Sequence, residues 1–428
     1  MSTQSVTDVS PAYRRFFPQL EGMRAVAAFG VLTTHVAFQT GAVRIPVIGE
    51  ILGRLDLAVA LFFALSGFLL WRTWVAAAHT VTGADGARHP AARVPGVRRY
   101  LRHRVVRIWP AYAVVVVTVL TLLPEARGVD ATVWLANLTL TQVFVPLSLT
   151  AGLTQMWSLS VEVAFYLLLP ILGCALCRVR GARVGARVPM LLALAVLSLG
   201  WAWVAQALPV PDGVEPTNWV FGHLPWFIAG LIVAEVSGAA ELGGSTRVTR
   251  ALERAGARRG PMLAVFVVAY GLACTPIAGP TGLGVLAPWQ FATKMTLGAV
   301  CGFAILAPLV CEKPCGRDSP RVHREFRFLT SPVMLALGRW SYAIFLWHVA
   351  VLAEVFGLFG IVPFSGHSIL VWCITVAVTI GISAASYAFV EEPARDWLRR
   401  RESARIARRS TNGEAEATTS DTATTAGS

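Results

Sequence analysis

Three ionisable side chains stand inside long apolar stretches of the sequence, where they could take part in proton transfer. They are His35, Glu162 and His348. Inserting an ionisable group into hydrocarbon costs about 2.5–3.5 kcal/mol, so each of them is a candidate for function. Neutral imidazole can accept a proton near pH 7, and a carboxylate at the same depth could orient the ring or stabilise developing charge. A rise of about 1.5 Å per residue places all three side chains in one layer.

Arginines form a second group of candidates. Arg24 stands eleven residues before His35, which puts both on one face of a helix and about 16 Å apart. Arg104 and Arg107 lie in the run RHRVVRIWP, just before another apolar stretch. Arginine presents five donors in a fixed fork that suits phosphate oxygens. The pattern predicts a phosphate-binding mouth at one membrane face, with the His/Glu layer about three helical turns above it.

Each of these residues also has a purely structural interpretation. A lone histidine in a helix bundle is often a hydrogen-bonded packing residue, and this applies to both His35 and His348. Glu162 could form a salt bridge with a neighbour such as Lys294. Most of the arginines could serve only to orient the chain in a membrane.

The elements that must position these residues are membrane-spanning helices. Of the 428 residues, 55% are apolar or aromatic and 14% are charged, against about 25% charged in ordinary soluble domains. Ten apolar stretches are long enough to cross about 30 Å of hydrocarbon: 24–42, 55–76, 107–124, 157–177, 188–208, 219–236, 261–279, 288–311, 336–357 and 368–390. We therefore predict an all-α, polytopic bundle of about ten transmembrane helices. The piece Trp134–Leu149 is predicted to be interfacial or re-entrant.

The distribution of positive charge predicts the orientation. With a cytoplasmic N-terminus, 30 of the 37 Lys and Arg residues fall on inner segments and three fall on outer ones. We therefore expect a plasma-membrane protein with both termini in the cytoplasm, and a net charge of +13 that reflects orientation in the bilayer rather than a nucleic-acid partner. The expected regions are a cytoplasmic leader (1–23), a membrane domain (24–398) and a disordered cytoplasmic tail (399–428). No disulfide framework and no metal site are predicted.

The candidate residues lie in motifs with a definite order along the chain. These are LEGMRAVAAFGVLTTHV with Arg24 and His35, FFALSGFLL with Ser66, the run from Arg104 and Arg107 to Tyr112, WSLSVEVAFYLLLP with Glu162 and Tyr166, GRWSYAIFLWHV with Tyr342 and His348, and VEEP at Val390–Pro393. Over residues 16–398 the chain resembles the membrane-bound acyltransferase 3 family. One position departs from its pattern, because Ala60 stands where many members carry an acidic residue; Asp56, four residues earlier, is the nearest acid.

The resemblance implies an enzyme that transfers an acyl group from cytoplasmic acyl-CoA to a hydroxyl. It implies His35 as the general base, with Glu162 as its partner in the catalytic layer, and Arg24, Arg104 and Arg107 at the phosphates of the donor. Ser66, Tyr166 and His348 are second-tier site residues, and Ser66 is the candidate nucleophile if the acyl group rests on the enzyme. No tightly bound cofactor is expected, and acetyl-CoA is the favoured co-substrate.

The acceptor is left between two classes. The resemblance implies either a sugar hydroxyl of a cell-envelope glycan or glycolipid, which we favour, or a small natural product such as a macrolide. The Arg-rich and Lys-poor composition is typical of a bacterium with a GC-rich genome. A membrane transporter or flippase is the alternative from a different class, because intramembrane ionisable groups also line transport paths. A covalent change in the acceptor would separate a transferase from a transporter.

Overall fold

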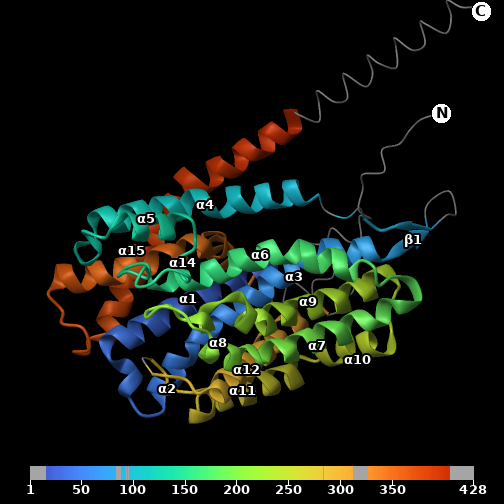
Figure 1. Ribbon diagram of the computed structural model, residues 1–428, viewed down its shortest axis with the longest axis horizontal. Helices are drawn as coiled ribbons and strands as arrows, with labels where there is room; N and C mark the ends of the chain where they lie inside the picture. The colour runs from blue at the N-terminus through green and yellow to red at the C-terminus, as the bar shows by residue number, and fades with distance from the viewer. Residues whose placement is uncertain are drawn as a thin grey trace, which may run out of the picture.

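The computed structural model describes residues 16–82, 88–92, 94, 96–282, 284–311 and 326–404. This part of the chain is an elongated helix bundle whose long helices follow its long axis (Figure 1). Its strands are β1 (Thr80–Thr82) and β2 (Arg88–Pro90), which pair antiparallel in a hairpin at one end of the bundle. The predicted all-α membrane bundle is confirmed.

The helices alternate with short connections. In the first half they are α1 (Pro18–Thr40), α2 (Ile48–Gly53), α3 (Ala58–Ala78), α4 (Val97–Leu122), α5 (Ala131–Leu138), α6 (Trp157–Leu176), α7 (Arg187–Leu199) and α8 (Trp201–Ala207). In the second half they are α9 (Val220–Leu242), α10 (Arg247–Gly256), α11 (Arg259–Ala273), α12 (Pro288–Val310), α14 (Pro332–Phe359) and α15 (Ser368–Ser386), which continues through a π turn, η9 (Tyr387–Glu391). The 3₁₀ turns are Ala42–Arg44, Arg54–Leu57, Pro124–Ala126, Thr154–Met156, Gly181–Ala186, Pro216–Asn218 and Pro276–Ala278.

Each of the ten predicted stretches is helical in the described part of the chain. Eight helical segments are long and apolar enough to cross a membrane: 48–78, 97–122, 154–176, 183–207, 216–242, 288–310, 332–359 and 368–404. The other two are α11, which has only 15 residues, and α1. Helix α1 has 23 residues but carries Glu21, Arg24 and His35. It packs against α3, α14 and α15, so its polar groups face protein.

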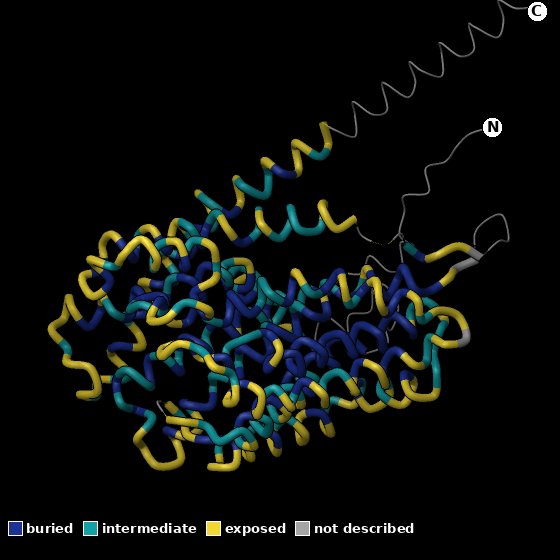
Figure 2. Tube along the Cα trace, viewed as in Figure 1, coloured by how far each residue is buried: buried dark blue, intermediate teal, exposed yellow. Residues whose placement is uncertain are grey.

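The centre of the bundle is the contact between α3 and α9. Helix α9 is the most enclosed of the candidate spans, with 94% of its apolar window buried. Figure 2 shows the buried stretches gathered along these helices in the middle of the molecule. A Cβ added at Gly67 would collide with the carbonyl oxygen of Phe227, and one added at Gly230 with that of Ala64. Glycines therefore let the two backbones touch, and this contact fixes Ser66 beside Gly67.

A buried ion pair joins α7 to α9. The Nε and Nη2 of Arg187 donate to Oε1 of Glu235 at 2.9 and 2.6 Å, and Trp71 Nε1 on α3 donates to the same oxygen at 2.7 Å. Arg187 Nη1 also donates to the carbonyl oxygen of Leu176 at 2.8 Å. Both charged side chains are almost fully buried, so loss of either one would leave the other buried without its counter-charge.

The segment 131–156, between α4 and α6, packs into the bundle and pairs its buried side-chain amide N–H groups with backbone carbonyl oxygens. Asn137 Nδ2 donates to Ser148 O at 2.9 Å, and Gln142 Nε2 donates to Met156 O at 3.0 Å. Gln155 Nε2 donates to Leu346 O on α14 at 2.9 Å. Irregular backbone at membrane depth is tolerated only where protein encloses it. These bonds tie the segment to the protein, and its assignment as interfacial or re-entrant stays a prediction.

Regular helix extends into both the predicted leader (1–23) and the predicted tail (399–428), whose boundaries stay predictions. Helix α1 already begins at Pro18, and proline suits the first helical position because it needs no amide partner. At the other end the last helix continues to residue 404. There Glu402 accepts hydrogen bonds from Arg99, Arg102 and His103 of α4, which ties this helix to the bundle. Residues 1–15 and 405–428 lie outside the described residues.

Candidate active site

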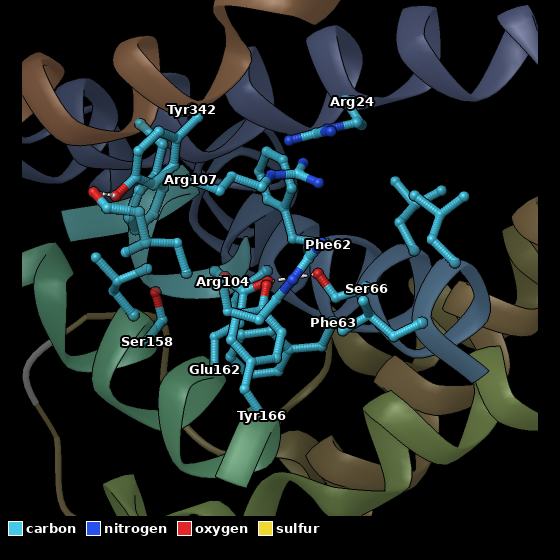
Figure 3. A pocket seen from close by; sticks show the side chains of 17 residues that line it. Arg24, Phe62, Phe63, Ser66, Arg104, Arg107, Ser158, Glu162, Tyr166 and Tyr342 are labelled. Carbon is cyan, nitrogen blue, oxygen red and sulfur yellow. Dashed lines mark hydrogen bonds between the residues drawn. The ribbon is translucent and has the colours of Figure 1, made fainter. Parts of the chain in front are cut away.

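A pocket between α1, α3, α4, α6 and α14 collects most of the predicted site residues (Figure 3). Its polar lining is Arg24, Ser66, Arg104, Arg107, Ser158, Glu162, Tyr166 and Tyr342. Its apolar lining is Val59, Phe62, Phe63, Leu65, Leu69, Leu70, Ile108, Leu159 and Phe345. The motifs that are far apart in the sequence therefore meet at one place in the fold.

The three predicted arginines converge on this pocket from two helices. Arg24 comes from α1, and Arg104 and Arg107 come from α4; Figure 3 shows all three pointing toward the same space. Within the described part of the chain none of them makes a side-chain hydrogen bond or ion pair. The Arg104 guanidinium lies 6.0 and 5.9 Å from the ring centres of Tyr100 and Tyr166, which are cation–π distances. Three like charges without a carboxylate partner suit an anionic ligand.

Glu162 is held by two hydroxyls. Ser66 Oγ donates to Oε1 of Glu162, and Tyr166 OH donates to the same oxygen at 2.6 Å (Figure 3). Because the hydroxyl protons of Ser66 and Tyr166 are both used in bonds to Glu162, this cluster has only hydrogen-bond acceptors left for a ligand. The structural alternative for Glu162, a salt bridge with Lys294, is wrong. Lys294 Nζ pairs instead with Oδ2 of Asp56 at 2.6 Å.

The two predicted histidines contact each other. His348 Nε2 lies 3.3 Å from His35 Nδ1, and the ring centres are 5.0 Å apart in an edge-on arrangement. His348 is almost completely buried and His35 is partly buried. Neither ring belongs to the lining of the arginine pocket. They lie just beyond its end, because Phe345 of the lining is 5.9 Å from the His348 ring and 6.2 Å from Phe62.

Carbonyl oxygens determine the tautomer of each ring. His348 Nδ1 lies 2.8 Å from Phe345 O and 3.1 Å from Ile344 O. His35 Nδ1 lies 2.8 Å from Val31 O. A carbonyl oxygen can only accept, so we assign the proton of each neutral imidazole to Nδ1. This assignment leaves the Nε2 of His35 with a free lone pair, which is the form that a general base requires.

The depth of Glu162 can be read from one contact. Gln155 of the segment before α6 hydrogen-bonds to Leu346 of α14. Glu162 lies seven residues beyond this contact in one direction, and His348 lies two residues beyond it in the other. Helical rise then separates Glu162 from the histidine pair by about 13 Å along the bundle.

The prediction that Glu162 shares a layer with His35 and His348 is therefore wrong. It assumed that the helix containing Glu162 starts at the membrane surface with Trp157. In the structure the segment 131–156 packs against the bundle before α6 begins, so the start of α6 cannot be taken as the membrane surface. Glu162 lies at the level of the arginines and makes no hydrogen bond to either histidine among the described residues. Its expected role as the orienting partner of His35 has no geometric support.

Two site residues were missed by the sequence analysis. Phe62 and Phe345 stand between the arginine pocket and the histidine pair, and both line the pocket. Phenylalanine on an apolar helix carries no signal of its own, although Phe62 belongs to the FFALSGFLL motif and Phe345 to GRWSYAIFLWHV. Asp56 and Ala60 are absent from the pocket lining; Asp56 is occupied by Lys294, and Ala60 is buried.

Comparison with known proteins points to one family. Residues 17–388 match the acyltransferase domain. A curated relative, the acyltransferase MdmB of Streptomyces mycarofaciens, is 30% identical over 171 residues, which cover 36% of this chain and 38% of the relative. The match therefore spans well under half of that relative's length. No solved structure matches the chain. Because the acyltransferase domain covers nearly the whole described bundle, the chain belongs to the acyltransferase 3 family.

Proposed function

We propose that this protein is an integral membrane O-acyltransferase that moves an acyl group, most simply acetyl, from cytoplasmic acyl-CoA to a hydroxyl. The proposal depends above all on one observation: His35 Nδ1 lies 2.8 Å from Val31 O, which assigns the ring proton to Nδ1 and leaves Nε2 as a free base. This base lies just beyond the end of a pocket lined by three arginines without a carboxylate partner in the described chain. Family membership supports the reaction class.

The donor would bind along the length of the pocket. Its phosphates would meet Arg24, Arg104 and Arg107, whose guanidinium forks match phosphate oxygens. Arg24 and His35 are eleven residues apart on α1, about 16 Å, a distance that the extended pantetheine arm of coenzyme A can cover. The acceptor groups around Glu162 lie beside this path, where they suit the amide N–H groups of the arm. The thioester would then lie near Phe62, close to the histidines.

The proposed reaction is a single transfer with His35 as general base. The acceptor hydroxyl gives its proton to His35 Nε2 while its oxygen attacks the thioester carbonyl carbon. The C–S bond then breaks and coenzyme A leaves as the thiolate. The thiolate takes the proton from the His35 imidazolium, which gives the free thiol and restores the neutral base. A positioned general base typically contributes about 10²–10⁴-fold to the rate.

The acceptor that we favour is a sugar hydroxyl of a cell-envelope glycan or glycolipid. In the proposed orientation both termini are cytoplasmic in the plasma membrane, so the histidine pair lies nearer the outer face than the arginines do. The donor would then enter from the cytoplasm and the acceptor from outside. A natural product such as a macrolide is the acceptor to compare with sugars in the same assay.

The test uses purified protein in lipid nanodiscs, with radiolabelled acetyl-CoA and a panel of glycan, glycolipid and macrolide acceptors. We expect acceptor-dependent release of free thiol and transfer of label to an acceptor. His35→Gln should lower both by about 10²–10⁴-fold. His223→Gln is the matched control, because His223 is also buried and its Nδ1 also faces the carbonyl oxygen four residues earlier, Trp219 O at 3.3 Å.

The outcomes separate the hypotheses. Wild-type activity in His35→Gln would refute the proposed base. An equal loss in both histidine variants would mean that the loss reflects packing rather than chemistry. No thiol release from folded wild-type protein with any acceptor would refute the transferase, and transport of an unaltered substrate would then become the leading function.

A further inference from the structure

The imidazole of His348 is held by hydrogen bonds as well as by packing. Its Nδ1 faces two carbonyl oxygens, those of Ile344 and Phe345, at 3.1 and 2.8 Å. The side chain is 1% exposed. These contacts assign the proton to Nδ1 and leave Nε2 as a bare acceptor. That acceptor lies 3.3 Å from Nδ1 of His35.

We infer that His348 is a positioning residue for the reaction, acting through His35 rather than on the substrate. Its Nε2 accepts part of the hydrogen bond from His35 Nδ1–H, which holds the ring of His35 with Nε2 free. It also stabilises the imidazolium that forms when His35 removes the acceptor's proton. This inference rests on the proposed function, because it assigns a role to His348 within the same site.

The physical argument concerns the change of charge on His35. In the neutral ring the Nδ1 proton is shared between Val31 O at 2.8 Å and His348 Nε2 at 3.3 Å. When the ring becomes an imidazolium, N–H donors strengthen, and hydrogen bonds to a charged donor are roughly twice as strong as neutral ones. A bare nitrogen already aimed at Nδ1 therefore stabilises the charged state more than the neutral one. Such differential stabilisation is what accelerates a chemical step.

His348 replaces the carboxylate that occupies the third position of a Ser-His-Asp triad. A carboxylate at this depth would be an isolated buried charge, which is costly. The carboxylate that the sequence offered for the role, Glu162, lies about 13 Å away and is bound by Ser66 and Tyr166. A neutral imidazole provides the acceptor without the charge. The order of contact is then acceptor hydroxyl, His35 Nε2, His35 Nδ1–H and His348 Nε2.

The alternative is that His348 only fills space between α1 and α14. Two variants of similar size separate the readings. His348→Gln keeps a carbonyl oxygen near the position of Nε2, whereas His348→Leu fills the space without an acceptor. A packing role predicts that both variants behave alike, and a positioning role predicts that only the leucine variant loses turnover.

The experiment measures kcat and the KM of acetyl-CoA for both variants in nanodiscs, together with their melting temperatures. We expect His348→Leu to lower kcat by about 10–100-fold, as is typical when the group that orients a functional histidine is removed. The donor KM should stay within about twofold, because the arginines that set it are untouched, and His348→Gln should keep most of the turnover. Equal kcat in the two variants, whether both high or both low, would overturn the inference.

A second measurement does not depend on activity. Solid-state NMR of protein labelled with ¹⁵N-histidine reports which ring nitrogen carries the proton, and His35→Gln identifies the signals of His35. We expect a protonated Nδ1 and a bare Nε2 at His35, and a proton on Nε2 would overturn the inference. Transfer that needs His35 but survives unchanged in His348→Leu would refute the role of His348 alone. Absence of any transfer by the wild type would refute the proposed function on which that role rests.

Discussion

Replacing Arg107 by alanine should weaken donor binding without destabilising the free protein. Arg107 lines the pocket with Arg24 and Arg104, and in the described chain its side chain has no hydrogen-bond or ion-pair partner. Removing it therefore leaves no protein carboxylate unpaired. It also removes a like charge from the group, so we expect the melting temperature of the ligand-free variant to equal or exceed that of the wild type.

The size of the binding defect follows from the bond that would be lost. A hydrogen bond to a charged group contributes about 1.5–3 kcal/mol, which corresponds to a rise in donor Kd of about 10–150-fold. A ligand at 100 times its Kd stabilises a protein by about 2.7 kcal/mol. If the variant's Kd rises about 100-fold, the same ligand concentration equals Kd and the stabilisation falls to about 0.4 kcal/mol. Most of the thermal shift induced by coenzyme A should therefore disappear.

The assay combines steady-state kinetics with thermal unfolding in detergent, at a coenzyme A concentration that saturates the wild type. We expect a higher KM for acetyl-CoA, an unchanged KM for the acceptor and a reduced thermal shift. Arg99→Ala is the matched control, because Arg99 lies on the same helix but its side chain is 68% exposed and pairs with Glu402. Its donor KM should stay within about twofold, since exposed ion pairs contribute only about 0–1 kcal/mol.

Two results would refute this reasoning. A donor KM that stays at the wild-type value in folded Arg107→Ala would remove the arginine from the donor site. A marked fall in the melting temperature of the ligand-free variant would mean that Arg107 has a structural partner, and the unpaired arginines would no longer indicate an anion site.

Two further changes test other parts of the structure. Arg187→Met should destabilise the bundle by about 3–5 kcal/mol, because it leaves Glu235 buried without its cation, and adding Glu235→Leu should recover most of that loss in a double-mutant cycle of thermal unfolding; no recovery would contradict the buried pair. Ser66→Ala should raise the KM of acetyl-CoA by about 2–12-fold, the value of one ordinary hydrogen bond, with little change in kcat. A fall of kcat to background would instead identify Ser66 as a nucleophile that carries the acyl group.

The sequence was sufficient for the helices and for the grouping of the arginines. Both follow from rules that act along one chain segment: an apolar stretch of sufficient length forms a spanning helix, and arginines at the ends of such stretches gather at one membrane face. Helix α1 is a less clear membrane span by its mean hydropathy, because Glu21, Arg24 and His35 lower its apolar content. Its helical state depends on packing against α3, α14 and α15, and only the fold reveals those neighbours.

Glu162 shows where reasoning from one segment fails. Its depth was estimated from the start of its own helix, on the assumption that the helix starts at the membrane surface. The segment 131–156 invalidates that assumption, because Asn137, Gln142 and Gln155 bury their amides in bonds to backbone carbonyls. Such bonds join residues 11 to 191 positions apart, so no pattern within α6 encodes them. The tautomers of His35 and His348 were equally inaccessible, because they depend on which nitrogen meets another ring and which meets a carbonyl.

In the proposed reaction, groups at different levels of the bundle act on different parts of the donor. Arg24 and His35 stand on one continuous helix, so their separation of about 16 Å is set by helical rise and cannot vary with the ligand. In the proposed reaction this fixes the distance between the donor's phosphates and the base. The groups at the arginine level, Glu162 and Ser66 included, then act on the arm of the donor and should be visible in KM. In this arrangement the space near Phe62 and Phe345, beyond the end of the arm, selects the acyl group. Substitutions there should change which acyl-CoA is preferred more than they change the affinity for coenzyme A.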